Sequence, residues 1–245
     1  MNSYLMINPH LEYAAYNLKK LCGSYCDKNR FYKLLYLLDC ELTEIGYGLD
    51  IPCYWYHDGV MIKDAENLFY LRKRDLFDIL PQDEKNDMNK SIEQFLKDNK
   101  SKTIKQLQSE LFKEAPFHFQ NEFHKFLIVV RGWKGKRTLD NYFNCSNTDN
   151  LNLLEKLEKT FPQKEFEDLY PLFLKWKNYV EYMVKHDESQ VETVLLVEEF
   201  SFLFNKKLKV VANENIYPET VTSWKAEYEK ARINFEKFLL EFSRD

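Results

Sequence analysis

The residue types that most often carry chemistry are sparse in this chain, and its cysteines are the first to consider. Cys22 and Cys26 are separated by three residues, and Cys53 and His57 repeat that spacing. Thiolates and imidazoles are the usual ligands of a structural zinc ion. In a regular strand, however, the Cα atoms of Cys53 and His57 would lie roughly 13 Å apart, too far to share one ion. We therefore interpret these cysteines as small buried thiols and expect no metal.

Acidic residues near the same segment offer a second kind of chemistry. They are Asp39, Glu41, Glu44 and Asp58. Carboxylates of this kind can gather a divalent ion for phosphodiester cleavage, so a metal-dependent nuclease is one alternative for the function. No strand carries the carboxylate-x-Lys step of common nuclease cores, and a solvated helix face is the better interpretation.

Other catalytic signatures are missing from the sequence. His118 and His124 are six positions apart, which places them on different faces of a helix and does not suit a shared ion. No Walker loop, dinucleotide-binding glycine pattern or nucleophile elbow is present, and six glycines in 245 residues leave little material for one. We therefore expect a protein that is not an enzyme and needs no cofactor.

Two basic clusters are candidates for contact with nucleic acid. The first is the run Arg72, Lys73 and Arg74. The second consists of Arg131, Trp133, Lys134, Lys136 and Arg137, interleaved with two glycines. Cations beside an aromatic ring and a flexible backbone suit a phosphate or a single strand, although a solvated loop explains them as well. A net charge of −4, from 35 basic and 39 acidic residues, argues against DNA binding by the whole surface.

The elements that position these residues are mainly helical. The hydrophobic fraction of 44%, with only six Gly and seven Pro, predicts a packed core of long regular elements. Apolar residues at helical spacing and capping residues predict helices over 9–22, 28–45, 88–96, 103–113, 116–130, 149–160, 164–186, 189–208 and 219–242. Pro171 is expected to break or kink the helix over 164–186.

The pattern changes to β between the second and third of these helices. The segment 51–57 is rich in aromatic residues, Asp58-Gly59 is a two-residue turn signal, and 60–62 can return as a partner strand. This predicts a small β-hairpin. A third strand around 67–71 is a weaker possibility, and the polar run 82–87 after Pro81 reads as a loop.

The most loop-like stretch of the chain sets the expected domain boundary. Residues 131–150 contain two glycines and several Asn and Ser residues. We therefore expect a mainly α protein, with a helical N-terminal domain bearing the hairpin over 1–130, a linker over 131–150 and a helical C-terminal domain over 151–245.

The last predicted helix carries a heptad seam. Its apolar residues are Val221, Trp224, Tyr228, Ala231, Phe235, Phe238 and Phe242. The seam has two interpretations. It packs into the second domain, since Trp and Phe are bulky for a two-stranded coiled coil, or it is exposed and binds a partner. Trp224, Tyr228 and Phe235 are the partner-binding candidates under the second interpretation.

Neither a leader nor an anchor is expected. Residues 1–10 have no basic or apolar run of the signal-peptide kind, and no apolar segment is long enough to span a bilayer. Five cysteines are an odd number without the density of a secreted scaffold. We expect a cytoplasmic protein without membrane contact.

Three segments of the N-terminal half carry a resemblance to a known family. They are Phe-Tyr-Lys-Leu-Leu-Tyr-Leu-Leu-Asp over 31–39, the stretch from Gly46 to Tyr-Trp-Tyr-His-Asp-Gly over 54–59, and Gln-Leu-Gln-Ser-Glu-Leu-Phe-Lys-Glu-Ala-Pro over 106–116. Together they resemble the Panacea family of prokaryotic antitoxin domains, over residues 9–125. Asp58-Gly59 stands where that family has Gly-Pro, so the turn and any contact it makes can differ.

The resemblance implies a protein-binding module rather than an enzyme. Domains of this family neutralise toxins or act as adaptors in toxin–antitoxin and phage-defence loci, which is an argument by analogy. The partner would be a toxin or a subunit of a defence complex, and Tyr54, Trp55, Tyr56 and His57 on the hairpin are the candidate anchors. Alternate members of that strand can instead be core. The other alternative is a regulator that contacts nucleic acid with the hairpin as a wing.

Overall fold

The structure, a computed structural model, describes residues 8–56, 59–63, 65–72, 79–134, 147–186, 189–213 and 218–242. Within these ranges the chain is mainly helical with one two-stranded antiparallel sheet, and the predicted mainly α fold is confirmed. The chain divides into an N-terminal unit, Met1–Tyr54 and Gly59–Glu114, and a C-terminal unit, Trp55–Asp58 and Ala115–Asp245. No helix in the described part is both long and apolar enough to cross a bilayer.

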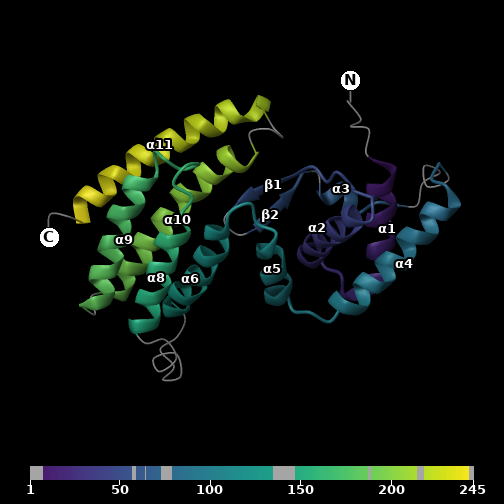
Figure 1. The fold of residues 1–245 in the computed structure, drawn as a ribbon, viewed down its shortest axis with the longest axis horizontal. Coiled ribbons are helices and arrows are strands. Elements are labelled where there is room, and N and C mark those ends of the chain that lie inside the picture. The colour runs from purple at the N-terminus through teal and green to yellow at the C-terminus, as the bar shows by residue number, and fades with distance from the viewer. Residues whose placement is uncertain are drawn as a thin grey trace. The chain divides into compact units, whose positions relative to one another are not determined.

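Up to Lys113 the described chain forms helices and one β-hairpin. In chain order its elements are α1 (Pro9–Cys22), the 3-10 helix η1 (Gly23–Tyr25), α2 (Lys28–Glu44), β1 (Cys53–Tyr56), β2 (Gly59–Ile62), α3 (Ala65–Phe69), α4 (Gln82–Asn99) and α5 (Ile104–Lys113) (Figure 1). Capping residues set the ends of the first two helices. The Asn8 side chain accepts the His10 N–H at 2.9 Å, and the Asp27 carboxylate accepts the Arg30 N–H at 2.8 Å.

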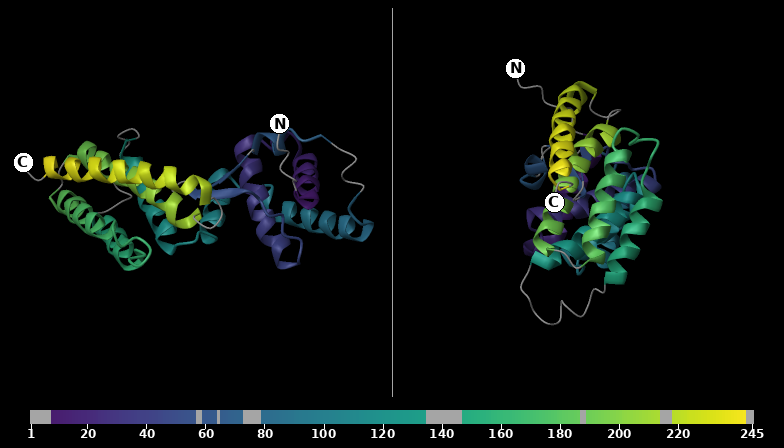
Figure 2. Two further views of the ribbon diagram at one scale, coloured as in Figure 1. Left: turned by 90° about the horizontal axis from the view of Figure 1, so that it is seen from above. Right: turned by 90° about the vertical axis from the view of Figure 1, so that its left-hand side faces the viewer.

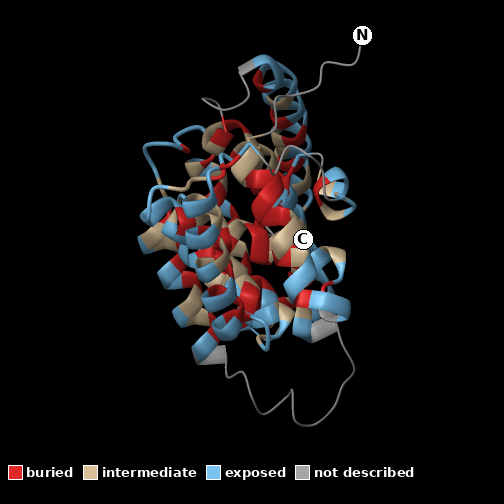
Figure 3. Ribbon diagram, turned by 90° about the vertical axis from the view of Figure 1, so that its right-hand side faces the viewer, coloured by how far each residue is buried: buried red, intermediate tan, exposed pale blue. Residues whose placement is uncertain are grey.

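The core of the N-terminal unit comes from the apolar stripes of these helices. In the ribbon of Figure 3, the buried residues, coloured red, lie mainly on the inner sides of the helices, and the exposed ones, pale blue, mainly on the outer sides. The fully buried members on α1 and α2 include Ala14, Ala15, Leu18, Phe31, Leu34, Leu35 and Leu38. Their recurrence every three or four residues is the pattern from which both helices were predicted.

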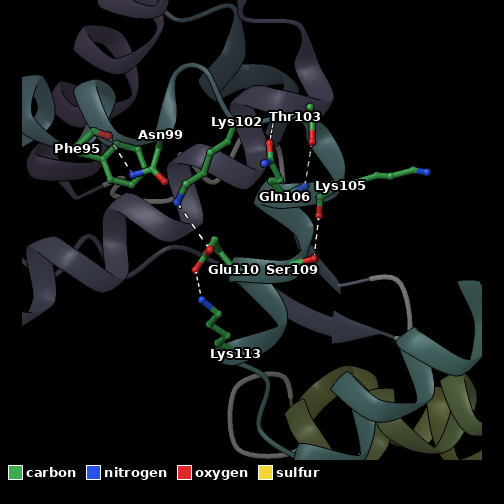
Figure 4. Close-up of polar contacts among 9 residues, drawn as sticks. All are labelled: Phe95, Asn99, Lys102, Thr103, Lys105, Gln106, Ser109, Glu110 and Lys113. Atoms are coloured by element: carbon green, nitrogen blue, oxygen red, sulfur yellow. Dashed lines mark hydrogen bonds and ion pairs between the residues drawn. The ribbon is translucent and has the colours of Figure 1, made fainter. Parts of the chain in front are cut away.

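Helix α5 begins with a capping box (Figure 4). The Thr103 N–H donates to Oε1 of Gln106 at 2.8 Å, and the Gln106 N–H donates to Oγ1 of Thr103 at 3.2 Å. Further along, Glu110 accepts from Lys113 at 2.5 Å and lies 3.8 Å from Lys102. The hydrogen bond from Lys113 lowers the pKa of Glu110. Strand β2 of the hairpin packs against α2 and α5.

Two expected segments of the N-terminal unit differ in the structure. The possible third strand around 67–71 is wrong, because α3 occupies Ala65–Phe69 and turns Leu68 into the core. The expected loop over 82–87 is also wrong, because these residues form the first turns of α4. Pro81 is the N-cap of that helix, and Asp83 and Glu84 lie in its first turn, where the helix dipole favours acidic side chains.

The C-terminal unit is a group of longer helices around an aromatic core. Its helices are α6 (His118–Lys134), α8 (Asn147–Thr160), α9 (Tyr170–Lys185), α10 (Gln190–Asn213) and α11 (Pro218–Phe242). Helices α10 and α11 lie side by side along much of their length (Figures 1 and 2). At the centre, the rings of Trp176 and Phe200 stack at 4.3 Å, and Nε1 of Trp176 donates to the carbonyl of Leu196 at 3.0 Å.

The boundary between the units lies earlier than the sequence suggested. Helix α6 was expected to close the first domain, but Phe119, Phe123 and Phe126 are fully buried in the aromatic core of the C-terminal unit. The break in the chain therefore falls between Glu114 and Ala115 rather than at 131. Residues 131–134 of the expected linker continue α6, and 135–146 lie outside the described residues.

The later helices also end at different residues from those expected. Helix α9 begins only at Tyr170, with Pro171 in its first turn, and residues 163–169 form turns. The predicted helix over 164–186 is therefore interrupted at Pro171, as expected. Helix α10 continues beyond 208 to Asn213, which is buried. The predicted last helix over 219–242 agrees with α11 to within one residue.

Candidate functional site

The residues considered for metal or nucleophilic chemistry do not assemble into a site. Burial raises the pKa of the thiols of Cys26 and Cys53 to about 12, so both carry a proton at neutral pH. Among the described residues, no three His, Cys, Asp or Glu side chains lie close enough together to hold a metal ion. His57 and Asp58 lie outside the described residues.

Asp39, one of the four acidic residues proposed for a nuclease site, organises the backbone instead. Its carboxylate accepts the Leu49 N–H at 2.7 Å, which ties α2 to the segment that leads into β1. Burial raises the pKa of Asp39. Glu41 and Glu44 are exposed on α2, as a solvated helix face requires.

The hairpin offers less surface than the sequence suggested. Trp55 is only 8% exposed, so its prediction as an interface anchor is corrected, and Tyr54 and Tyr56 are half-buried. Trp55 is the one buried residue of β1, and Cys53, Tyr54 and Tyr56 are intermediate. Met61 on β2 is exposed.

A side chain that the sequence analysis missed holds this strand. Oδ1 of the buried Asn213 accepts the Trp55 N–H at 3.1 Å, and its Nδ2 lies 3.4 Å from the Trp55 carbonyl oxygen. The amide thus pairs with Trp55 as a neighbouring strand would. Because the two residues are 158 positions apart, no local pattern could reveal the pairing.

Replacing Asn213 with alanine should therefore destabilise the C-terminal unit. The change leaves the Trp55 N–H buried without its acceptor, which costs about 1–3 kcal/mol. Urea denaturation followed by circular dichroism measures the loss. Asn178→Ala, on α9, is a surface comparison; equal effects of the two substitutions would contradict the role given to Asn213.

The heptad seam of α11 packs against the other helices of the C-terminal unit. Tyr228 and Phe235 are each 3% exposed, and the Phe235 ring lies 5.9 Å from that of Phe200. Trp224 is half-buried. The prediction of Tyr228 and Phe235 as partner contacts is therefore corrected, and the interpretation in which the seam packs into the second domain is the one that the structure has.

The basic residues also separate into different environments. Arg72 is exposed, whereas Arg131 lies in α6 and pairs with Glu198 of α10 at 3.1 Å. Trp133 and Lys134 belong to α6, but their side chains are not described. Four further candidates, Lys73, Arg74, Lys136 and Arg137, lie outside the described residues. The expected loop contact at Arg131 is thus replaced by an ion pair between helices.

One face of α10 carries apolar side chains toward solvent. Val191, Leu195 and Phe202 are 79%, 46% and 52% exposed. Their spacings of four and seven residues place all three on one side of the helix. We call these three residues the α10 stripe.

Charged groups accompany the α10 stripe. Glu198 lies between Leu195 and Phe202 on the same face and is paired with Arg131, and the Lys206 ammonium lies 5.3 Å from the centroid of the Phe202 ring. Glu192 and Glu199 are exposed nearby on the helix. The arrangement is a narrow apolar surface with a mostly acidic rim.

The sequence signal for the α10 stripe was an excess of apolar residues. Between Thr193 and Phe204 apolar side chains occur on every side of the helix, more than one buried face needs. Buried and exposed members cannot be told apart by spacing alone.

A scan against protein-family models, a search of curated proteins and a search of solved structures each found no match to this chain.

Proposed function

We propose that this protein is a non-enzymatic, cytoplasmic protein-binding module, an antitoxin-like or accessory subunit of a prokaryotic toxin–antitoxin or phage-defence complex. The observation that supports it most directly is the α10 stripe, in which three large apolar side chains share one face of a helix and lie open to solvent. The Panacea-like segments of the N-terminal half point to the same class of function by analogy.

The α10 stripe has the chemistry of a helix-docking surface. Exposed apolar side chains at four- and seven-residue spacing match the anchors of an amphipathic helix laid alongside. Glu192 and Glu199 add negative charge at the edge, so the partner should present an apolar helix face flanked by Lys or Arg. A toxin or a defence-complex subunit with such a helix is the proposed occupant.

The test is capture of the tagged full-length chain from its host, with nuclease present and at moderate salt. Leu195→Asp combined with Phe202→Asp should remove the captured partner, by at least about tenfold, because it places two charges in an apolar contact. Melting followed by circular dichroism should be unchanged, since both side chains are exposed.

A matched control is available on α11. Ile233 is 45% exposed on a face that does not pack into the core, so Ile233→Asp makes the same change at similar exposure. The proposal predicts a partner that the control retains and the stripe variant loses. Equal capture by both variants would overturn the assignment, and so would a mass in solution showing that a second copy of this chain covers the α10 stripe.

A further inference from the structure

An exposed aromatic ring next to the end of α3 is flanked by cations. Tyr70 is 61% exposed, and the ammonium groups of Lys28 and Lys19 lie 5.1 and 5.4 Å from its ring centroid. Distances of this size correspond to cation–π interactions. The Phe69 ring packs edge-on against Tyr70 at 5.2 Å and steadies it from one side. Tyr70 is thus an exposed aromatic residue with two ammonium groups over its ring.

Neighbouring helix ends add further cations to this surface. Nζ of Lys100 donates to the Leu21 carbonyl at 3.2 Å, which brings the end of α4 to the end of α1. In the sequence Lys20 directly precedes Leu21 and Arg72 lies two positions after Tyr70, and both residues are exposed. We call the set Lys19, Lys20, Lys28, Tyr70, Arg72 and Lys100 the Tyr70 cluster.

Few acidic groups offset this charge. Glu66 pairs with Lys28 at 2.6 Å, and the Asp27 carboxylate is engaged in capping α2. Among the described residues these two carboxylates lie beside the cluster's five cations, and the exposed Asp98 is two positions before Lys100, whereas the whole chain carries a net charge of −4. The Tyr70 cluster is a local positive surface on an acidic protein.

Helix capping accounts for only part of this arrangement. Lys19 and Lys20 lie in the last turn of α1, where a cation interacts favourably with the helix dipole. Lys28, however, is the first residue of α2, where the dipole disfavours a positive charge. Capping also gives no reason for the aromatic ring of Tyr70 to face solvent.

We propose that the Tyr70 cluster binds single-stranded nucleic acid, with a base stacked on Tyr70 and the backbone phosphates beside the lysines and Arg72. Aromatic rings next to a positive surface are the usual means of binding single strands without sequence preference, because every base offers a face for stacking. The exposed ring favours this ligand over an anionic membrane, which the same charges could attract.

The first test measures binding of labelled oligothymidylate and oligouridylate to the full-length chain by fluorescence anisotropy at several salt concentrations. Loss of one stacked base weakens binding about 5- to 150-fold, which is the expected effect of Tyr70→Ala. Tyr70→Phe keeps the ring and should bind as the parent does. Lys20→Gln should lower the slope of log affinity against log salt by about 0.7, the value for one phosphate of a single strand.

Lys90→Gln is the matched control for charge. Lys90 is exposed on α4, about 15 Å along the helix axis from Lys100, and its loss should leave the salt slope unchanged. No oligonucleotide binding at low salt would overturn the proposal. So would affinity that is equal in Tyr70→Ala and the parent, or binding only to vesicles containing phosphatidylserine. Because the α10 stripe lies in the other unit, the stripe variant should bind oligonucleotides normally, which separates this proposal from the proposed function.

Discussion

Replacing Trp176 with alanine should destabilise the C-terminal unit by about 3–5 kcal/mol, the range for loss of a large buried aromatic side chain. Trp176 is fully buried and stacks on Phe200 at 4.3 Å with an interplanar angle of 16°. It also meets Phe123 and Phe126 edge-on at 6.2 and 6.1 Å. One side chain thus joins α6, α9 and α10, and its removal leaves a cavity that three helices must share.

Urea denaturation followed by circular dichroism measures this effect without relying on tryptophan fluorescence. Tyr182→Ala is the control, since Tyr182 is exposed on the same helix and its removal should change stability by no more than about 0.5 kcal/mol. A Trp176→Ala protein as stable as the Tyr182→Ala protein would show that the aromatic cluster does not hold the unit together.

Local signals in the sequence were sufficient for most of the helices. Asn8-Pro9 and Asp27 each signal the start of an apolar periodic run, and Asn8 and Asp27 cap the helices predicted there. Thr103, the first residue of the predicted helix over 103–113, is the N-cap of α5. Such signals work because capping and burial of one face act within a few turns of chain. Pro81 followed by Asp83 and Glu84 is the same kind of signal, but the polar composition of the run favoured a loop.

Features that depend on contacts between residues far apart in the sequence could not be predicted from local signals. The phenylalanines of α6 are regularly spaced, but spacing does not say which unit they pack into. The core partners of Phe123 include Trp176 and Phe200, more than fifty residues further along. Because of these contacts α6 belongs to the C-terminal unit, and the boundary lies before it.

The candidate interface residues could not be predicted from local sequence either. The sequence predicts aromatic interface anchors on the hairpin and on α11, yet Trp55, Tyr228 and Phe235 are buried. Large aromatic side chains bury most area in cores and at interfaces alike, so their type does not decide between the two. The exposed fraction of a side chain does distinguish core from surface, and Phe202 and Tyr70 are both exposed.

Replacing Gly59 with alanine should destabilise the hairpin by about 2–4 kcal/mol, from backbone strain together with overpacking. Gly59 opens β2 with φ at +126°, a conformation that residues with a Cβ rarely adopt. A Cβ at this position would also lie 3.0 Å from Cδ2 of Leu111, which is buried on α5 and has little room to move. Denaturation followed by circular dichroism measures the combined cost.

Two comparisons separate the cost of backbone strain at Gly59 from the cost of overpacking against Leu111. Gly132 lies in α6 with nothing within 4 Å of an added Cβ, so Gly132→Ala should raise stability by about 0.5–1 kcal/mol through helix propensity. In a Leu111→Ala background the steric overlap at Gly59 disappears but the positive φ remains, so the cost of Gly59→Ala should shrink without vanishing. A cost that is unchanged by Leu111→Ala would mean that backbone strain alone fixes glycine at this turn, and no cost in either background would mean that the turn can adopt another conformation.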